Sequence, residues 1–234
     1  MALLGTIINS AAILVGAALG LVLGRLLAPL EETIMRGLGL AVIAIGLKMA
    51  LETEDVLGLA ASLAIGGAIG AAMGIERRMA RFADRLGARF SQTGGSRLGE
   101  AFLTTTLIYI TGSMSILGAL ESGLENDHHL LYMKAFLDGF TAILFAGTLG
   151  LGVALSAVPV FLYQGSIALA ARMIVERLPQ EALATVVQAL NGVGGMLIVA
   201  IGLNLSAIGR FRVGDYLPAL VIAVLWTLLR LSFA

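Results

Sequence analysis

The sequence has no cysteine, and only 13% of its 234 residues are charged. The absence of cysteine excludes disulfide bonds, thiolate metal sites and cysteine nucleophiles. The charged fraction is about half of the roughly 25% found in soluble domains. Fifteen basic and fifteen acidic residues give a net charge of zero, without the basic excess typical of proteins that bind nucleic acid. We therefore expect neither a soluble domain nor a nucleic-acid-binding protein.

Motifs for catalysis and nucleotide binding are also missing. The sequence contains no Walker-type loop, no GxSxG and no HExxH, and no nucleophile has an evident base as partner. His128 and His129 are adjacent but lack a third ligand at metal spacing, so we expect both to be solvated. The sequence predicts no enzyme, no cofactor and no metal site.

What the sequence does contain is apolar residues, at 59% of the chain, with a mean hydropathy of +0.97. A membrane-spanning helix needs about 20 mostly apolar residues. The first such run begins at the N-terminus without a basic region or cleavage site, which indicates a retained helix and not a signal peptide. The sequence predicts an all-α polytopic bundle embedded in the lipid bilayer, with about eight transmembrane helices: Leu3–Leu26, Ile34–Leu51, Val56–Ile75, Glu100–Leu120, Leu131–Ala157, Val158–Val175, Ala182–Ile208 and Tyr216–Phe233. Pro159 marks the expected turn between the fifth and sixth of these.

The arginines predict the orientation of the bundle. Six lie between the third and fourth helices: Arg77, Arg78, Arg81, Arg85, Arg89 and Arg97. The positive-inside rule makes this loop cytoplasmic, and alternation then places both termini outside. Apolar residues recur at helical spacing over 75–90, opposite the arginines, which is typical of an amphipathic helix on the membrane surface. A basic loop that only sets the topology explains the same residues.

Two stretches of the sequence match at a constant offset of 156 residues. Ala44–Leu47 (Ala-Ile-Gly-Leu) recurs as Ala200–Leu203, with Gly39 and Gly195 in the same register. The offset aligns helices one to three with helices six to eight, an odd shift that predicts inverted topology, as in many secondary transporters. We divide the single transmembrane domain (1–234) into a first repeat (1–75), a cytoplasmic amphipathic helix and linker (76–99), a central helix pair (100–157) and a second repeat (158–234).

Glycines at four-residue spacing form two ridges, at positions 16, 20 and 24 and at positions 66, 70 and 74. Such ridges let helix backbones approach closely, within the monomer or in a homodimer. Glycines that line a narrow pore are the alternative.

Polar residues within the predicted spans mark candidate binding sites, because they are costly in lipid. Asn9 and Ser10 align with Gly165 and Ser166, beside Gln164, and two such kinks would form a pseudo-symmetric site. In helix seven, Asn191 precedes Gly192, Gly194 and Gly195. A helix break there would free carbonyls for a cation or a half-helix N-terminus for an anion. Gly37 and Gly39 are the repeat counterparts.

Further candidates lie in the second, fourth, fifth and seventh helices. Ser113 and Ser115 flank Gly112 in helix four, although such hydroxyls often bond their own helix. Asp138 follows Lys134 by one turn and could either pair with it or bind a proton or cation. Lys48 aligns with Asn204, and snorkelling to the surface competes with a role as counter-charge.

Several short motifs resemble one family over nearly the whole chain. They are Gly5–Ser10, Gly37–Leu40, Ile45–Lys48, Gly112–Gly118, Leu137–Gly139, Tyr163–Ser166 and Gly202–Leu205. The resemblance is to the bacterial membrane family called domain of unknown function 554. It implies a multi-pass protein of the bacterial cytoplasmic (inner) membrane with a suspected transport role, and it assigns no substrate and no functional residues.

The sequence thus favours a small secondary transporter or facilitator of a small ion or polar solute. A passive channel and a non-transporting scaffold or sensor are the alternatives. The expected binding residues are Asn9, Ser10, Ser113, Ser115, Asp138, Gln164, Ser166, Asn191 and Asn204. The expected helix breaks are at Gly37, Gly39, Gly112, Gly165, Gly192, Gly194 and Gly195.

Overall fold

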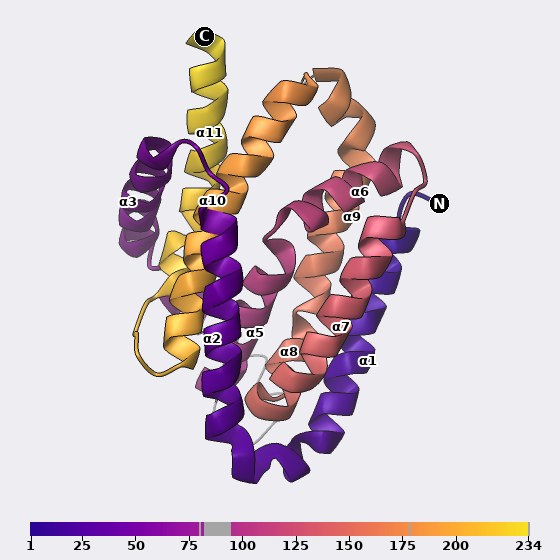
Figure 1. Cartoon of the computed structure of the whole chain (residues 1–234), viewed down its shortest axis with the longest axis vertical. Helices are drawn as coiled ribbons and strands as arrows, with labels where there is room; N and C mark the ends of the chain where they lie inside the picture. Colours follow the sequence, from indigo (N-terminus) through magenta and orange to yellow (C-terminus); the bar gives the residue numbers. More distant parts are fainter. Residues whose placement is uncertain (80, 82–94, 178, 234) are drawn as a thin grey trace. The chain divides into compact units, whose positions relative to one another are not determined.

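A computed structural model describes the chain except for residues 80, 82–94, 178 and 234 (Figure 1). The described part is helical and contains no strand, which confirms the all-α prediction. Its elements are α1 (Leu4–Leu27), η1 (Ala28–Leu30), α2 (Glu31–Ala50), α3 (Val56–Met73), α5 (Gly95–Ile110), α6 (Ser113–Leu124), α7 (His129–Leu149), α8 (Gly152–Leu155), α9 (Ala157–Arg177), α10 (Gln180–Leu205), η2 (Val213–Tyr216) and α11 (Leu217–Phe233). Most of the amphipathic segment predicted at 75–90 lies outside the described residues.

The number of spans agrees with the sequence. Among the described residues, seven helices are long and apolar enough to cross a membrane, and the bent pair α5–α6 makes eight if it counts as one span. Since a bilayer core of about 30 Å requires about 20 helical residues, the chain is a multi-pass membrane protein.

The predicted break at Gly112 is confirmed. α5 and α6 meet there at an angle of 61°. Gly112 has φ 122° and ψ 146°, a conformation that is essentially restricted to glycine. The N–H of Thr111 still bonds the carbonyl of Leu107, and the N–H of Ser115 bonds the carbonyl of Gly112, so each half keeps its own hydrogen bonds.

The turn expected at Pro159 lies nine residues earlier instead. α7 ends at Leu149, and Gly150 makes the turn with φ +87°. Pro159 lies in the first turn of α9, where an N–H has no partner within the helix and its loss costs nothing. A positive φ favours glycine, which explains why the turn lies at Gly150.

The other predicted helix breaks are wrong, because α2, α9 and α10 are continuous through them: Gly37, Gly39, Gly165, Gly192, Gly194 and Gly195. Several of these glycines provide close packing instead. A β-carbon on Gly39 would lie 2.8 Å from the Gly202 carbonyl oxygen, and one on Gly192 would lie 2.8 Å from Thr53 Cβ. Burial against a neighbouring helix outweighs the weak helix propensity of glycine.

The chain forms two compact units, the first made of Met1–Ile34 and Ala80–Glu176. In this unit α1 and α7 run side by side and parallel along their lengths (Figure 1). The first glycine ridge makes the contact, in the pairs Gly16 with Gly139, Gly20 with Ile143 and Gly24 with Gly147. Small residues on both helices let the backbones touch, as expected for packing within the monomer.

The broken pair α5–α6 runs the length of the first unit. Gly152, which follows the end of α7, lies against Leu98 near the start of α5. At the other end, Gly118 of α6 lies against Leu131 near the start of α7. α7 has 21 residues and is therefore about 31 Å long. This geometry favours one broken span over a re-entrant loop.

The second unit consists of Met35–Met79 and Arg177–Ala234. Within it α2 packs against α10 and α3 against α11, and both pairs are antiparallel. Gly66 and Gly70 of the second ridge lie against Ala219 and Asp215, whereas Gly74 caps α3 with φ +61°. Two carboxylates accept hydrogen bonds from residues of this unit that are distant in the sequence. Asp55 accepts from Trp226, and Glu76 accepts from the N–H of Gly214.

Candidate functional site

A buried ion pair lies in the middle of α7. Lys134 Nζ is 3.0 Å from Oδ1 and 3.0 Å from Oδ2 of Asp138, and both side chains are 8% exposed. The spacing of four residues places the two groups on one helix face. Asp138 lies nine residues after the start of α7, or about 14 Å along a span of about 31 Å. A charge pair at this depth is a rare feature of a membrane helix.

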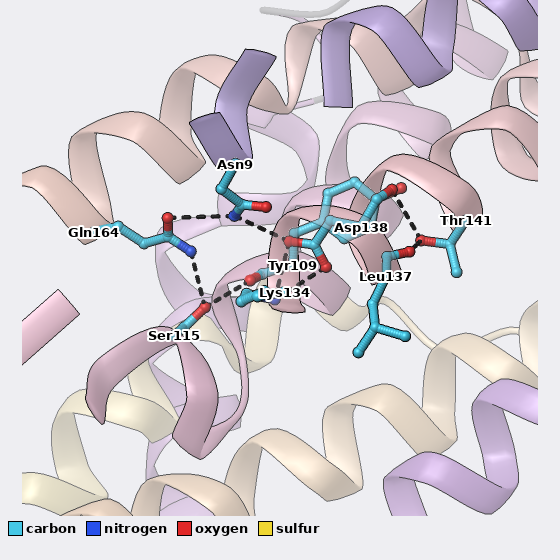
Figure 2. A network of polar contacts seen from close by, with 8 residues as sticks. All are labelled: Asn9, Tyr109, Ser115, Lys134, Leu137, Asp138, Thr141 and Gln164. Atoms are coloured by element: carbon cyan, nitrogen blue, oxygen red, sulfur yellow. Dashed lines mark hydrogen bonds and ion pairs between the residues drawn. The ribbon is translucent and has the colours of Figure 1, made fainter. Parts of the chain in front are cut away.

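Asn9 of α1 joins this pair to a third helix. Its Nδ2 donates to Asp138 Oδ2 at 3.1 Å and to Gln164 Oε1 of α9 at 3.2 Å. Asn9 is fully buried, and it is brought to α7 by the same close contact that pairs Gly16 with Gly139. Figure 2 shows the amide between the carboxylate and the glutamine.

The network continues across the helix break. Gln164 Nε2 donates to Ser115 Oγ at 3.3 Å, and Ser115 Oγ donates to the carbonyl of Tyr109 at 2.8 Å (Figure 2). Ser115 belongs to α6 and Tyr109 to α5, so one hydroxyl links the two halves of the broken span. A chain of polar contacts thus runs from the ion pair of α7 through α1 and α9 to the break.

Some buried polar atoms around the network have no hydrogen-bond partner among the described residues. They are Thr6 Oγ1, Asn9 Oδ1 and Ser10 Oγ. Buried polar atoms in proteins are paired in the large majority of cases, so each unpaired one indicates room for water, an ion or a ligand atom. Thr6, Asn9 and Ser10 share one face of α1 by their spacing of three and four residues.

The structure brings together four of the predicted site residues: Asn9, Ser115, Asp138 and Gln164. Ser10 is buried on α1, and Ser113 is the partly exposed first residue of α6. Ser166 is exposed and donates to the carbonyl of Tyr163 on its own helix at 2.8 Å. The pseudo-symmetric pair of kinks predicted around Ser10 and Ser166 is wrong, since α1 and α9 are continuous.

The remaining two predicted residues belong to the second unit. Asn191 is 4% exposed, and its Nδ2 donates to Glu52 Oε2 at 3.1 Å. Asn204 donates to the carbonyl of Phe211 and accepts from its N–H, both at 2.8 Å. Asn204 therefore closes the loop after α10. Its repeat counterpart, Lys48, lies in the last turn of α2.

Sequence reasoning missed two features. Tyr109 enters the site through its carbonyl, which no sequence pattern identifies. The second feature is a cluster on Asp55, which accepts from Gly58 N (2.8 Å) and Trp226 Nε1 (3.0 Å) and pairs with Arg230 at 2.6 Å. Burial alone would raise the pKa of Asp55, but these donors hold the pKa below its ordinary value. A polar pocket of about 280 Å³ adjoins this cluster.

The donor set of the site in the first unit is made of oxygen and nitrogen atoms from one carboxylate, one amine, two amides and one hydroxyl. Among the described residues, no group of three or more His, Asp or Glu side chains is placed to hold a metal ion. The arrangement can bind a small charged or hydrogen-bonding species, and it lacks the clustered ligands of a structural metal centre.

Comparisons with known proteins agree with the membrane architecture. A model of the family described as "Protein of unknown function (DUF554)" matches residues 4–228. The chain is 31% identical over 223 residues to the "Uncharacterized membrane protein YdfK" of Bacillus subtilis (strain 168), covering 93% of each chain. It is 28% identical over 226 residues to the "Uncharacterized protein YqgA" of Escherichia coli (strain K12), covering 94% of each. No solved structure matches the chain significantly.

Proposed function

We propose a transport function for this chain, which belongs to the DUF554 family of proteins of unknown function. The protein acts as a small secondary transporter or facilitator that moves a small ion or polar solute across the cytoplasmic membrane of a bacterium. The substrate binds in the first unit, at the network around Asp138. This network is the observation that carries the proposal.

Stability alone does not account for the Lys134–Asp138 pair. Removing an ion from water costs several kcal/mol even after the protein relaxes, and apolar residues of similar volume are often as stable as a buried ion pair. The pair is also surrounded by Asn9 and Gln164, two further polar side chains that a purely apolar packing would not need. Ionisable groups at this depth in a membrane commonly mark an ion or substrate pathway.

The break at Gly112 supports the same site. Secondary transporters commonly place broken helices at the substrate site, where half-helix ends offer backbone groups to the ligand. In this chain Ser115 connects the break directly to Gln164, and through it to Asn9 and Asp138. A change at the ion pair can therefore reach the junction of the two half-helices.

The proposal includes an inverted repeat. Contacts between α2 and α10 recur when both residues are exchanged for those 156 positions away: Gly39–Ser206 corresponds to Gly195–Ala50, and Gly46–Val199 to Gly202–Ile43. Such reciprocal, antiparallel contacts are expected for two equivalent helices related by a two-fold axis. They support an arrangement in which α1–α3 and α9–α11 cross the membrane in opposite directions. The arginines between α3 and α5 support the placement of both termini outside.

A non-transporting scaffold is the second candidate. The full pairing of Lys134 with Asp138 favours it, because a satisfied ion pair can serve only to fix how helices pack. A passive channel is the third form of the hypothesis and would use the same polar path without a saturable site. A homodimer, with lipid around it, is compatible with all three.

Uptake by the purified full chain in liposomes tests the proposal, with sodium, rubidium, methylammonium, phosphate, glycine and glycerol as labelled probes. We expect saturable uptake of at least one probe, reduced about tenfold or more in Asn9→Ala and Asp138→Asn, since each removes a hydrogen bond to a charged group. Ser166→Ala is the matched control, because its hydroxyl bonds only its own helix, and it should transport normally. Non-saturable flux would indicate a channel. No uptake of any probe, in protein shown to be folded, would reject transport in favour of the scaffold.

A further inference from the structure

We propose that Asp138 binds a monovalent cation and that the ammonium group of Lys134 occupies this cation site when the ion is absent. The inference rests on the proposed function and adds the class of substrate. Lys134 then acts as a tethered competitor: the ion enters as the ammonium group leaves.

The position of the ammonium group indicates where a cation would bind. Lys134 Nζ lies 3.0 Å from each oxygen of Asp138, in the place that an ion bound by both carboxylate oxygens would take. Lys134 is on the same helix, one turn away, and its long flexible stem allows the head group to swing aside. Once it does, the buried carboxylate has no counter-charge and strongly favours another cation.

The neighbouring atoms are suited to a small hard cation. Asn9 Oδ1 is fully buried and has no partner among the described residues, which leaves an acceptor without a donor beside the carboxylate. Gln164 Oε1 and Ser115 Oγ extend this oxygen-rich surface. Oxygen ligands suit hard cations, whereas divalent ions are usually held by more than one carboxylate. One carboxylate therefore indicates a single positive charge.

An anion fits these groups less well. It would have to approach Lys134 on the side where Asp138 already lies, and the unpaired atom of Asn9 can only accept. The half-helix that begins at Ser113 does favour negative charge at its N-terminus. The hydroxyl in the first turn of this half-helix, Ser115 Oγ, donates to the Tyr109 carbonyl and is therefore not free to donate to an anion.

The charge balance requires the ammonium group to move as the cation binds. If the cation entered while the ammonium group of Lys134 stayed beside Asp138, the buried site would hold one uncompensated positive charge, which is costly. The other side chains that face the site are uncharged: Asn9 from α1, Ser115 from α6, Gln164 from α9 and the phenol of Tyr109 from α5. Lys134 is therefore the group that competes with the cation for Asp138.

Cation binding to the purified full chain in detergent tests the inference, measured as the rise in unfolding temperature in lithium, sodium, potassium or ammonium chloride against choline chloride. We expect wild type to be stabilised by at least one cation. Lys134→Gln should bind that cation about tenfold more tightly, because the competitor is gone. Asp138→Asn should lose binding, and Ser166→Ala should match wild type.

Whether Lys134→Gln binds the cation more tightly or more weakly than wild type decides whether Lys134 is a competitor. Weaker cation binding in Lys134→Gln, or no cation effect in folded wild type, would overturn the inference. If Lys134→Gln does not fold, the neutral double variant Lys134→Gln/Asp138→Asn and the tolerant substitution Lys134→Arg provide the comparison. Lys134→Arg keeps a tethered positive charge, so it should bind the cation no more tightly than wild type, whereas clearly tighter binding would contradict the role of Lys134 as a competitor. Uptake by the same samples in liposomes keeps the two proposals apart: saturable uptake of an anion or neutral solute, with no cation binding, would leave transport standing and refute the cation site.

Discussion

Gly46 of α2 and Gly195 of α10 meet backbone to backbone. A β-carbon built on Gly46 would lie 2.6 Å from the carbonyl oxygen of Gly195, and one built on Gly195 would lie 2.6 Å from the carbonyl oxygen of Gly46. The contact is the same in both directions. Gly46 aligns in the repeat with Gly202, and Gly195 aligns with Gly39. Gly202 and Gly39 make the equivalent contact, so a two-fold axis that relates the repeats would exchange the two contacts.

This contact predicts the effect of adding one methyl group. Gly195→Ala should lower the free energy of unfolding by about 1–3 kcal/mol, because a close-packed backbone cannot move aside without strain. Thermal unfolding of the purified protein measures the change. Gly37→Ala is the matched control on α2, with no atom within 4 Å of the added carbon, and should be neutral or stabilising by up to about 1 kcal/mol. Equal losses in both variants would contradict the packing argument.

A second loss of stability is expected at Gly112, because of its backbone conformation and not because an added β-carbon would lack space. At φ 122° and ψ 146° a side chain is strained, so Gly112→Ala should cost about 1–3 kcal/mol or straighten the α5–α6 junction. Gly165→Ala serves as comparison, because its added carbon would lie 3.6 Å from Leu3 in ordinary contact within a continuous helix. Thermal unfolding and uptake, measured on both, should separate them. A Gly112→Ala protein with wild-type stability and uptake would show that the break is not required.

The Lys134–Asp138 pair predicts non-additive losses of stability. Asp138→Asn and Lys134→Gln each leave a buried charge without its partner and should cost about 3–5 kcal/mol. The double variant removes both charges and should recover most of that loss, and the double-mutant cycle gives the coupling energy. Additive losses would mean that the two groups do not interact in the membrane.

Asp55 predicts acid sensitivity of the second unit. Its pKa in the folded chain is held below the ordinary value of 3.8 by Gly58, Arg230 and Trp226, despite its partial burial. The stability from these contacts is therefore fully present above about pH 4 and is lost as the pH falls through the folded-state pKa. Because Trp226 is the one tryptophan of the chain, its fluorescence reports the change directly. Asp55→Asn should be less stable near neutral pH and show a smaller acid dependence; an unchanged acid profile would contradict this role.

Local sequence signals predicted much of the fold correctly. Hydropathy located the spans, since their length is set by the bilayer, and the glycine ridges at positions 16 and 66 identified contact faces. Polar residues inside apolar runs identified Asn9, Ser115, Asp138 and Gln164 as site candidates. Their meeting in one network could not be predicted, because it depends on which helices pack together.

The helix breaks show where local reasoning stops. Gly112 and Gly195 both lie in apolar, glycine-containing runs, yet only Gly112 breaks its helix. The propensity of glycine is the same at both positions, at about 1 kcal/mol less favourable than alanine. What differs is the neighbour: Gly195 has a backbone packed against it, whereas at Gly112 the chain turns by 61° into α6.

By itself, the sequence determined that this chain spans a bilayer as a bundle of about eight helices. In lipid, an α-helix forms all of its backbone hydrogen bonds within its own segment. The sequence also determined which residues are too polar to be there without partners. The tertiary structure alone decided the partners: Asp138 meets Asn9 across 129 positions of the chain, while Ser166, equally polar in the sequence, bonds its own helix. Helix contacts in a membrane are selected by shape and hydrogen bonding between distant segments, and those terms exist only once the helices are packed.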